Sequence, residues 1–403
     1  MPSLIFKKGL DLKREVAGQL AASYHSDLVA DIKAHDYRYE AGRLTIHLAR
    51  EFGFCYGVDR AVDYAYQARL KFPARRVFLT GEIIHNPHVN DQLRAQGIRF
   101  LSDASESWAA LTADDVVILP AFGVTVEDLV RLDTLGCTLV DTTCGSVLNV
   151  WKNVRRYASD GFTSIIHGKH WHEETRATAS QAVQVSGGHY LVVLDRAEAD
   201  LVCAFITSAP PPGSEARAAL LDRFRDACSP GFDPDSHLVQ IGCANQTTML
   251  STESFAIGEQ FRAAIRQRYG TEAEALHFRA FDTICSATQD RQDAVVAMLD
   301  ERQLDAMIVI GGYNSSNTCN LARLCAAKVP TYHIADPSGL RSRDLIRHRD
   351  VRTKTEIEST AWLPDGPITI GLTSGASTPD NLVEATVLAL TAFTAEPAVV
   401  VAP

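Results

Sequence analysis

Residues 51–62, EFGFCYGVDRAV, connect a strand-like run to an amphipathic helix pattern. The preceding run, RLTIHLA (Arg43–Ala49), is rich in aliphatic and β-branched residues, and Cys55 lies where this run gives way to the helix. The apolar positions of the helix pattern fall on one face: Val58, Val62, Ala65 and Leu70. The stretch therefore predicts a cysteine at a strand-to-helix joint.

Two later stretches repeat this arrangement. Cys144 ends the strand-like CTLVDTTC, Cys285 ends FDTIC, and a helical pattern follows each of them. Three thiolates brought to one point would make a metal or iron–sulfur site with one open coordination position. Zinc sites more often show paired short spacings, and the common ferredoxin runs are absent, so spacing alone leaves the metal open.

The composition is that of an ordinary globular protein. Of 403 residues, 46% are hydrophobic and 22% charged, and the length allows two to four domains of about 100–200 residues. The net charge of −10, without a long basic run, argues against a nucleic-acid or membrane partner. No run approaches the roughly 18 apolar residues that span a bilayer. The N-terminus lacks signal-peptide and transit-peptide features, so we expect a cytoplasmic protein.

The nine cysteines show no dense spacing and no C-x-x-C pair, so they do not resemble a disulfide framework. In a reducing compartment most should be thiols, and a buried cysteine behaves as a small hydrophobic residue. We expect this structural role for six of them: Cys137, Cys203, Cys228, Cys243, Cys319 and Cys325.

After residue 42, short β-branched runs alternate with polar clusters and helical patterns, which is typical of α/β units with parallel strands. The cysteines divide this part into a loose threefold repeat. We expect three comparable α/β segments, 43–143, 144–284 and 285–393. A peripheral N-terminal extension (1–42), with two short helices, and a C-terminal tail (394–403) flank them. If the segments face one another, their polar strand ends would converge on one cavity.

Polar motifs follow several of the expected strands, and none is a P-loop or a dinucleotide fingerprint. They supply donors suited to phosphate oxygens: His85, His172, Ser315, Ser316, Asn317 and Ser377. Asn317 and Ser377 each lie just before a helical pattern, where N-capping is the commoner role. His85 could equally be a satisfied core histidine.

Glu173 and Glu174 follow His172 in the motif HGKHWHEET. A carboxyl group in a dry cavity has a raised pKa and can donate a proton near neutral pH, which is the role we consider for Glu174. A surface carboxylate in the first turn of a helix is the alternative, and this description suits Glu173.

These motifs together resemble the 4-hydroxy-3-methylbut-2-enyl diphosphate reductase (LytB) family, and more specifically its plant and cyanobacterial branch. The resemblance runs in order from about Leu44 to near Thr391 through GFCYGVDRA, EIIHNPHVN, LPAFG, VDTTC, IIHGK, HEET, ANQTTML, DTIC, GGYNSSNT and GLTSGASTPD. It implies three α/β units in a trefoil around a 4Fe–4S cluster. It also implies reductive removal of the substrate hydroxyl to give isopentenyl and dimethylallyl diphosphate, the last step of the non-mevalonate isoprenoid route.

Site roles are carried over residue by residue. The resemblance makes Cys55, Cys144 and Cys285 the cluster ligands, which leaves one iron open to substrate. Glu174 would be the proton donor. Thr247, the first threonine of ANQTTML, would contact the substrate and help relay the proton. The substrate, chiefly its diphosphate, would be bound by His85, His172, Ser315, Ser316, Asn317 and Ser377. Two electrons would arrive singly from an external carrier of the ferredoxin or flavodoxin type.

The chain departs from the common bacterial pattern at a few positions. Phe122 stands where many bacterial members have histidine, which removes one diphosphate donor. Gly145 replaces the usual proline after Cys144, and Ser286 replaces an acidic residue after Cys285. The last two changes touch the surroundings of the cluster, which tune its potential.

Two other classes stay open. An aconitase-like iron–sulfur hydro-lyase also leaves one iron open but transfers no net electrons, so a requirement for a reductant separates the two. A non-catalytic iron–sulfur sensor would not need Glu174, Thr247 and the diphosphate donors together.

Overall fold

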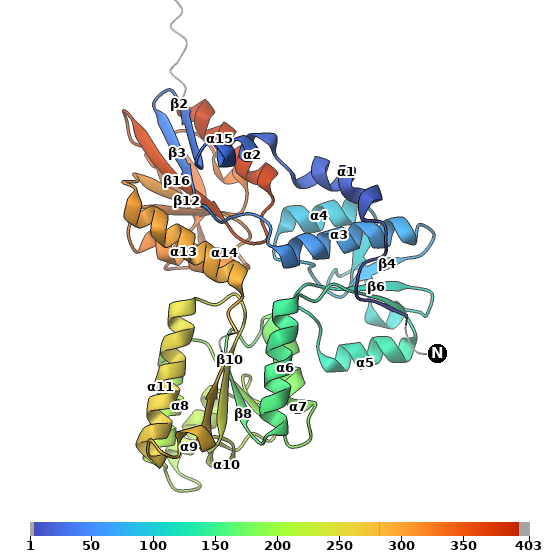
Figure 1. Cartoon of the computed structure of the whole chain (residues 1–403), viewed down its shortest axis with the longest axis vertical. Helices are drawn as coiled ribbons and strands as arrows, with labels where there is room; N and C mark the ends of the chain where they lie inside the picture. The colour runs from blue at the N-terminus through green and yellow to red at the C-terminus, as the bar shows by residue number, and fades with distance from the viewer. Residues whose placement is uncertain (1–3, 282, 395–403) are drawn as a thin grey trace, which may run out of the picture. The chain divides into compact units, whose positions relative to one another are not determined.

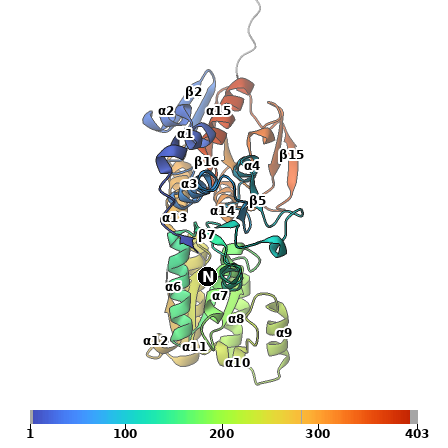
Figure 2. The same ribbon diagram turned by 90° about the vertical axis from the view of Figure 1, so that its right-hand side faces the viewer.

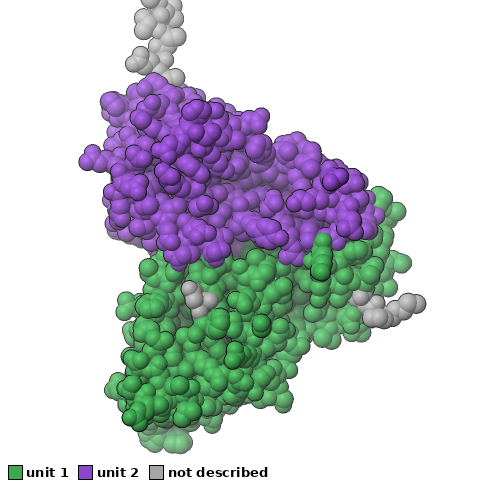
Figure 3. All heavy atoms as spheres, viewed as in Figure 1, with its two compact units in different colours: residues 1–8, 72–83, 98–285 green, residues 9–71, 84–97, 286–403 purple. Residues whose placement is uncertain are grey.

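The computed structural model describes residues 4–281 and 283–394, and it forms two compact units (Figure 3). Unit 1 comprises residues 1–8, 72–83 and 98–285, and unit 2 comprises residues 9–71, 84–97 and 286–403. The chain therefore passes repeatedly from one unit to the other. Strands and helices alternate in both units, which confirms the α/β class expected from the sequence.

Unit 1 contains two sheets, and every strand pairing within them is parallel. The first sheet has the order β1-β7-β6-β4-β5. Its strands are β1 (Ile5–Phe6), β4 (Val77–Leu79), β5 (Ile98–Phe100), β6 (Val116–Leu119) and β7 (Thr138–Asp141). The helix α5 (Val126–Leu135) joins β6 to β7, and the short η1 (Trp108–Ala110) precedes β6. The aliphatic side chains of β6 and β7 pack with Leu132 of α5 in one core.

The second sheet of unit 1 has the order β11-β10-β8-β9. Its strands are β8 (Thr163–His167), β9 (Tyr190–Val193), β10 (Ile241–Asn245) and β11 (Phe278–Ala280). Figure 1 shows α6 (Gly145–Ser159) and α7 (Glu173–Val183) on one side of this sheet and α8 (Arg196–Ser208) and α11 (Ser251–Tyr269) on the other. Three shorter helices complete it: α9 (Glu215–Arg223), α10 (Pro234–His237) and α12 (Glu274–His277).

Unit 2 is built on one mixed sheet of seven strands in the order β15-β14-β13-β12-β16-β3-β2. Its strands are β2 (Arg38–Ala41), β3 (Leu44–Leu48), β12 (Ala306–Ile310), β13 (Thr331–Ile334), β14 (Leu345–Arg349), β15 (Glu356–Thr360) and β16 (Ile368–Ser374). The pairings among β13, β12, β16 and β3 are parallel, and those at the two edges are antiparallel. Figure 2 shows several of these strands from a second side.

The helices of unit 2 come from three parts of the chain. They are α1 (Lys13–Tyr24), α2 (Asp27–Ala34), α3 (Tyr56–Lys71), α4 (Pro87–Ala95), α13 (Ser286–Glu301), α14 (Ser316–Ala326), the short η2 (Pro337–Gly339) and α15 (Asp380–Thr394). Every residue of the central strand β12 is buried, as in parallel strands covered on both faces. Each fully buried aliphatic side chain there contributes roughly 1.5–3 kcal/mol to folding.

The strand at Leu44–Leu48 does not join the strands that follow it in the chain. We expected it in the first segment (43–143), but β3 pairs in parallel with β16, so it belongs to the sheet that also holds the strands of the third segment. The N-terminal extension is also less peripheral than expected. Its two predicted helices are confirmed as α1 and α2, while β1 pairs with β7 and β2 pairs with β3.

Other differences are local. The strand expected at FDTIC lies earlier, at Phe278–Ala280, and residue 282 is outside the described residues. Leu70 was expected on the apolar face of its helix but is 49% exposed. Most of the C-terminal tail, from residue 395, also lies outside the described residues. Within residues 4–281 and 283–394, no helix is long and apolar enough to cross a membrane. The expected cytoplasmic location and the trefoil arrangement stay predictions.

Candidate active site

Each candidate ligand cysteine directly precedes a helix. Cys55 comes before α3, Cys285 comes before α13, and Cys144 is the N-cap residue of α6. The N-terminus of a helix carries a partial positive charge, which is a favourable place for a negatively charged group. The structure therefore confirms the helix joints that the sequence predicted for all three cysteines.

Five of the six other cysteines lie in surroundings that raise the pKa of the thiol. Burial raises the pKa of the Cys203 and Cys325 thiols to about 12. Burial also raises the pKa of Cys137, Cys228 and Cys243. A raised pKa keeps these sulfurs protonated at neutral pH, and a protonated thiol is a poor ligand. These five cysteines are therefore in accord with the structural role expected for them.

In unit 1, a buried carboxyl group is held by one threonine. Glu174 is 1% exposed, and it lies in the first turn of α7. The backbone N–H of Thr247 donates to Glu174 Oε1 at 2.6 Å, and the Thr247 hydroxyl donates to Oε2 at 3.1 Å. Cys285 is tied to the same residue, because its N–H donates to the Thr247 carbonyl at 3.2 Å. One short loop therefore brings Glu174, Thr247 and Cys285 together.

His172 caps the helix that carries Glu174. Its Nδ1 accepts the backbone N–H of Glu174 at 3.1 Å, so a neutral ring carries its proton on Nε2. The ring of Phe122 packs edge-on against the imidazole, with centroids 5.3 Å apart. Phe122, a departure from the common pattern, therefore helps to hold His172 in place. Glu173 is about half exposed, in accord with the surface role considered for it.

Cys144 lies beside a small apolar cluster in unit 1. It packs against Val147, Trp151 and Ala177, and Ala177 belongs to α7, three residues after Glu174. The helix that carries the buried carboxyl thus contacts the environment of a second candidate ligand. In unit 1 the structure brings Cys144, His172, Glu174, Thr247 and Cys285 to α7 and its neighbours.

In unit 2, the turn after β16 collects the remaining candidates. The N–H of Cys55 donates to the Ala376 carbonyl at 3.1 Å, and the Ala376 N–H donates to Asn317 Oδ1 at 3.0 Å. The Ser377 hydroxyl donates to the His85 carbonyl at 3.3 Å. Three residues that are far apart in the sequence, Cys55, His85 and Asn317, are therefore linked through the single turn at residues 375–377.

The residue that caps α14 is not the one considered in the sequence. Ser315 is the N-cap residue, and its hydroxyl accepts the Thr318 N–H at 3.3 Å. Asn317 was considered as a cap, but it lies inside the first turn of α14. Ser377 lies three residues before α15 begins, so it does not cap that helix. The polar side chains here are all buried: His85, Ser315, Ser316, Asn317 and Ser377.

Two glycines allow these segments of unit 2 to approach one another. A Cβ on Gly312 would lie 2.4 Å from the His85 carbonyl oxygen, and a Cβ on Gly375 would lie 1.9 Å from Thr318 Oγ1. Any larger residue would push the segments apart. The glycines of the motifs GGYNSSN and TSGAST are therefore needed for close packing.

Some supporting residues were not singled out in the sequence. Thr288, which is 1% exposed, accepts a hydrogen bond from Asn317 Nδ2 at 3.4 Å. Arg291, which is 3% exposed, donates from Nη2 to the Gly53 carbonyl at 2.7 Å. Both residues lie on α13. The only sequence signal that could have identified them is the recurrence of polar residues on the inner face of this helix. Arg291 anchors the segment that leads into Cys55.

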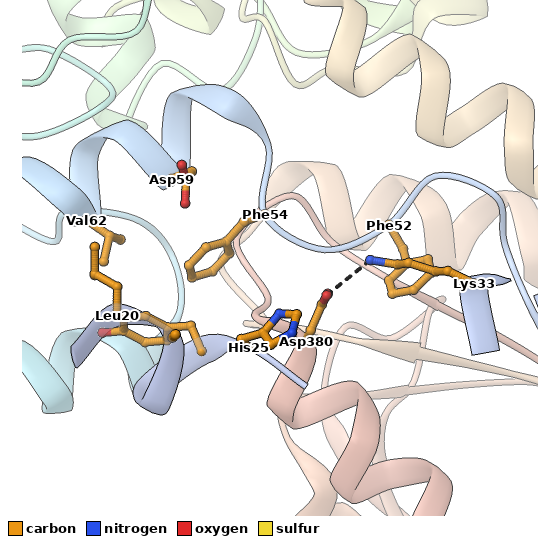
Figure 4. A pocket seen from close by; sticks show the side chains of 10 residues that line it. Leu20, His25, Lys33, Phe52, Phe54, Asp59, Val62 and Asp380 are labelled. Carbon is orange, nitrogen blue, oxygen red and sulfur yellow. Dashed lines mark hydrogen bonds and ion pairs between the residues drawn. The ribbon is translucent and has the colours of Figure 1, made fainter. Parts of the chain in front are cut away.

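A cavity of about 270 Å³ lies beside this segment in unit 2 (Figure 4). Lys33 of α2 pairs with Asp380 at 3.1 Å, and its ammonium lies 4.5 Å from the centre of the Phe52 ring. The lining comes from α1, α2, α3, the Cys55 segment and α15: Leu20, Ala21, Tyr24, His25, Lys33, Phe52, Phe54, Asp59, Val62 and Asp380. The N-terminal helices therefore support the stretch that carries one candidate ligand.

Cysteines that precede helices in an α/β chain are a donor set that an iron–sulfur cluster can use, and a buried carboxyl group can take part in proton transfer. The model of the LytB protein family matches residues 46–391, so the chain belongs to the LytB family. Members of this family contain an iron–sulfur cluster.

Two curated relatives are 47% identical to this chain. The 4-hydroxy-3-methylbut-2-enyl diphosphate reductase of Thermosynechococcus vestitus aligns over 94% of this chain and 92% of its own length. The protein of the same name from Gloeobacter violaceus aligns over 94% of this chain and 90% of its own length. The resemblance inferred from the motifs is thereby confirmed, including its cyanobacterial character.

Solved structures show the same fold. A structure of (E)-4-hydroxy-3-methyl-but-2-enyl diphosphate reductase, described as the terminal enzyme of the non-mevalonate pathway, has a TM-score of 0.50 and 25% identity over 86% of this chain and 99% of that one. The reductase of Plasmodium falciparum has a TM-score of 0.62 and 21% identity, over 86% of this chain and 87% of that one. The second likeness supports the fold alone.

The packing around Cys144 yields a test by substitution. Gly123 has φ +77°, and an added Cβ would lie 2.4 Å from the rigid indole of Trp151. We expect Gly123→Ala to lower the free energy of unfolding by about 2–5 kcal/mol, the sum of the left-handed backbone penalty and overpacking. Gly187→Ala is the matched control, because it has the same φ with nothing within 4 Å, and it should cost about 1–2 kcal/mol. Urea unfolding measures both, and equal losses would contradict the packing argument.

Proposed function

We propose that this chain reduces (E)-4-hydroxy-3-methylbut-2-enyl diphosphate to isopentenyl diphosphate and dimethylallyl diphosphate. The observation that carries the proposal is the Glu174–Thr247 pair, a buried carboxyl group with a hydroxyl at 3.1 Å. It lies in a chain that is 47% identical to proteins named as this reductase. A buried acid with a hydroxyl neighbour is the equipment needed to protonate a leaving oxygen.

The proposed cofactor is a single 4Fe–4S cluster with Cys55, Cys144 and Cys285 as its ligands. The helix joints of these three cysteines support the assignment, and so do the raised pKa values of five of the other cysteines. When bound, such a cluster supplies one-electron chemistry and an iron position that is open to substrate. The protein supplies the orientation of the substrate and the protons.

The reaction balances with two electrons and two protons. One C–O bond of the substrate breaks, one C–H bond forms, and the hydroxyl leaves as water. The sequence has no dinucleotide fingerprint, so we propose that two equivalents of a reduced external carrier, of the ferredoxin or flavodoxin type, supply the electrons. A requirement for reductant separates this reaction from that of an iron–sulfur hydro-lyase.

Glu174 and Thr247 would act as a short proton relay. A protonated Glu174 can pass its proton to the Thr247 hydroxyl, which can donate and accept at once and can rotate to release a proton on its other side. Water is excluded from the carboxyl group, which is 1% exposed, so the proton would go to the substrate and not to solvent. The backbone N–H of Thr247 fixes the carboxylate after the proton leaves.

The diphosphate would be bound by neutral or weakly basic donors. Ser316 and Asn317 lie in the first turn of α14, where backbone N–H groups and the helix dipole favour an anion. Ser377 lies in the turn at residues 375–377, where its hydroxyl donates to the His85 carbonyl. The Nε2–H of His172 is a further donor. Hydrogen bonds to a charged group contribute about 1.5–3 kcal/mol each, so a few of them suffice.

The ligand assignment predicts which cysteines carry the iron. Serine at Cys55, Cys144 or Cys285 should deplete iron and the brown cluster absorbance in protein purified without oxygen. Serine at Cys203 or Cys325, whose thiols are kept protonated by burial, should leave the iron content near that of the original protein. A full iron content after Cys285→Ser would contradict the assignment.

The proton donor can be tested by two neighbouring substitutions. Glu174→Gln keeps the shape of the side chain but cannot supply an acid proton, so turnover with excess reductant should fall by about 10²–10⁴-fold while the cluster stays intact. Glu173→Gln, at an exposed position, should stay within a few-fold. If instead the position-173 variant were inactive and the position-174 variant active, the donor would be assigned to the wrong glutamate.

Binding of the diphosphate can be tested at Ser377. Removing its hydroxyl should weaken substrate binding by about ten- to a hundredfold, as expected for one hydrogen bond to a charged group. Calorimetry of cluster-loaded Ser377→Ala measures this loss. Ser214→Ala, which removes the cap of α9, a helix that carries none of the candidate residues, should leave the affinity unchanged. An unchanged affinity in Ser377→Ala would show that the hydroxyl serves only its bond to the His85 carbonyl.

A further inference from the structure

The helix α6 has a charge pattern unlike that of its neighbours. It carries Lys152, Arg155 and Arg156 and no acidic residue over its 15 residues. Among the α-helices of residues 4–281 and 283–394, only α14 also lacks acidic residues, and α14 has a single basic one, Arg323. The helices α3 and α11 also carry three basic residues each, but each of them has two acidic residues as well, whereas the three positive charges of α6 have no acidic residue beside them on the helix.

The basic residues of α6 lie on its outer face. The opposite face is buried through Val147, Val150, Trp151, Val154 and Tyr157. Lys152 and Arg156 are exposed and four residues apart, so they lie one turn apart on the same side. Figure 2 shows α6 along the left edge of unit 1.

The charges around this face leave it basic. Arg155 donates to Gln181 of α7 at 3.2 Å, which holds its guanidinium over the groove between the two helices. The acid that follows α6, Asp160, is engaged by both Arg156 and Arg279. On α7, the exposed Arg176 offsets Glu173. The field of the patch is therefore positive and available to an acidic partner.

The same helix begins at a proposed cluster ligand. Cys144 is its N-cap, Gly145 is exposed, and Leu148, one turn further along, is 43% exposed. At 1.5 Å per residue, Lys152 and Arg156 lie about 12 and 18 Å along the axis from Cys144. Weak electron-transfer complexes bury less than about 1,200 Å² in total, which is a disc of roughly 14 Å radius on each partner. The centre of the basic turn is about 15 Å from Cys144 along the axis, so a partner of this size centred there covers most of the helix between the basic turn and Cys144.

We propose that the outer face of α6 is the docking surface for a small acidic electron carrier of the ferredoxin type. The proposal rests on the function proposed above, which needs an external one-electron donor. Acidic carriers complement a basic patch, and such complementarity raises the rate of encounter more than the lifetime of the complex. Leu148 would supply an apolar contact near the end of the helix at which electrons enter.

The test compares two charge-reversal pairs in the cluster-loaded protein. Lys152→Glu with Arg156→Glu removes the basic turn. Arg196→Glu with Arg225→Glu is the control, because both arginines are exposed residues of unit 1 outside α6 and the net charge changes equally. Binding of an oxidised plant-type ferredoxin is measured by calorimetry at low salt. Turnover is measured with reduced ferredoxin and, separately, with a reduced viologen.

We expect the α6 pair to weaken ferredoxin binding, and to raise the ferredoxin concentration needed for half-maximal turnover, by about tenfold or more. The viologen-driven rate should stay within twofold, because a small reductant needs no docking surface. Ferredoxin binding by the original protein should weaken with salt, since charges separated by more than about 10 Å are screened at 0.1 M. The charge-conserving pair Lys152→Arg with Arg156→Lys should retain binding.

Equal ferredoxin binding by the α6 pair and the original protein would overturn the proposal, and so would equal losses in the α6 and control pairs. Failure of the proposed function gives a different result. In that case the original protein would not convert the diphosphate even with the viologen, whereas the binding measurement would still decide whether ferredoxin docks on α6.

Discussion

The burial of one carboxyl group constrains the arrangement of unit 1. Glu174 is removed from water, and a buried carboxyl group is costly unless its oxygens have partners. Both partners come from Thr247, through its backbone and its hydroxyl. The carbonyl of the same residue receives the N–H of Cys285. Any change that moves this loop therefore disturbs the acid, the hydroxyl beside it and a proposed cluster ligand together.

In unit 2, backbone groups rather than a buried carboxyl group hold the candidate residues together. Cys55 and Asn317 are both bonded to Ala376, while Ser377 reaches the His85 carbonyl. Gly375 makes the close packing possible, because any Cβ there would overlap Thr318. Polar side chains that are buried and already bonded lose little entropy when an anion binds, so the proposed diphosphate site would be organised before the substrate arrives.

The departures from the common family pattern acquire physical meaning in this arrangement. Phe122 stands where many family members have a histidine that could donate to the diphosphate. Its ring packs against His172 and helps to orient that imidazole. The glycine that follows it, Gly123, leaves room for Trp151, which also packs beside Cys144. The surroundings of one proposed ligand and the position of one proposed diphosphate donor are therefore connected through a short turn.

The sequence by itself determined the α/β class, the cysteines before three helices and the polar motifs at strand ends, because periodicity and helix starts are short-range properties of the chain. It also indicated Glu174 over Glu173 through the family resemblance. Only the tertiary structure decided that β3 pairs with β16 and that Thr288 and Arg291 support the site. These pairings join residues that are 29 positions apart for Thr288 and Asn317 and more than 200 apart for Arg291 and Gly53, and nothing in the local pattern of either partner specifies the other.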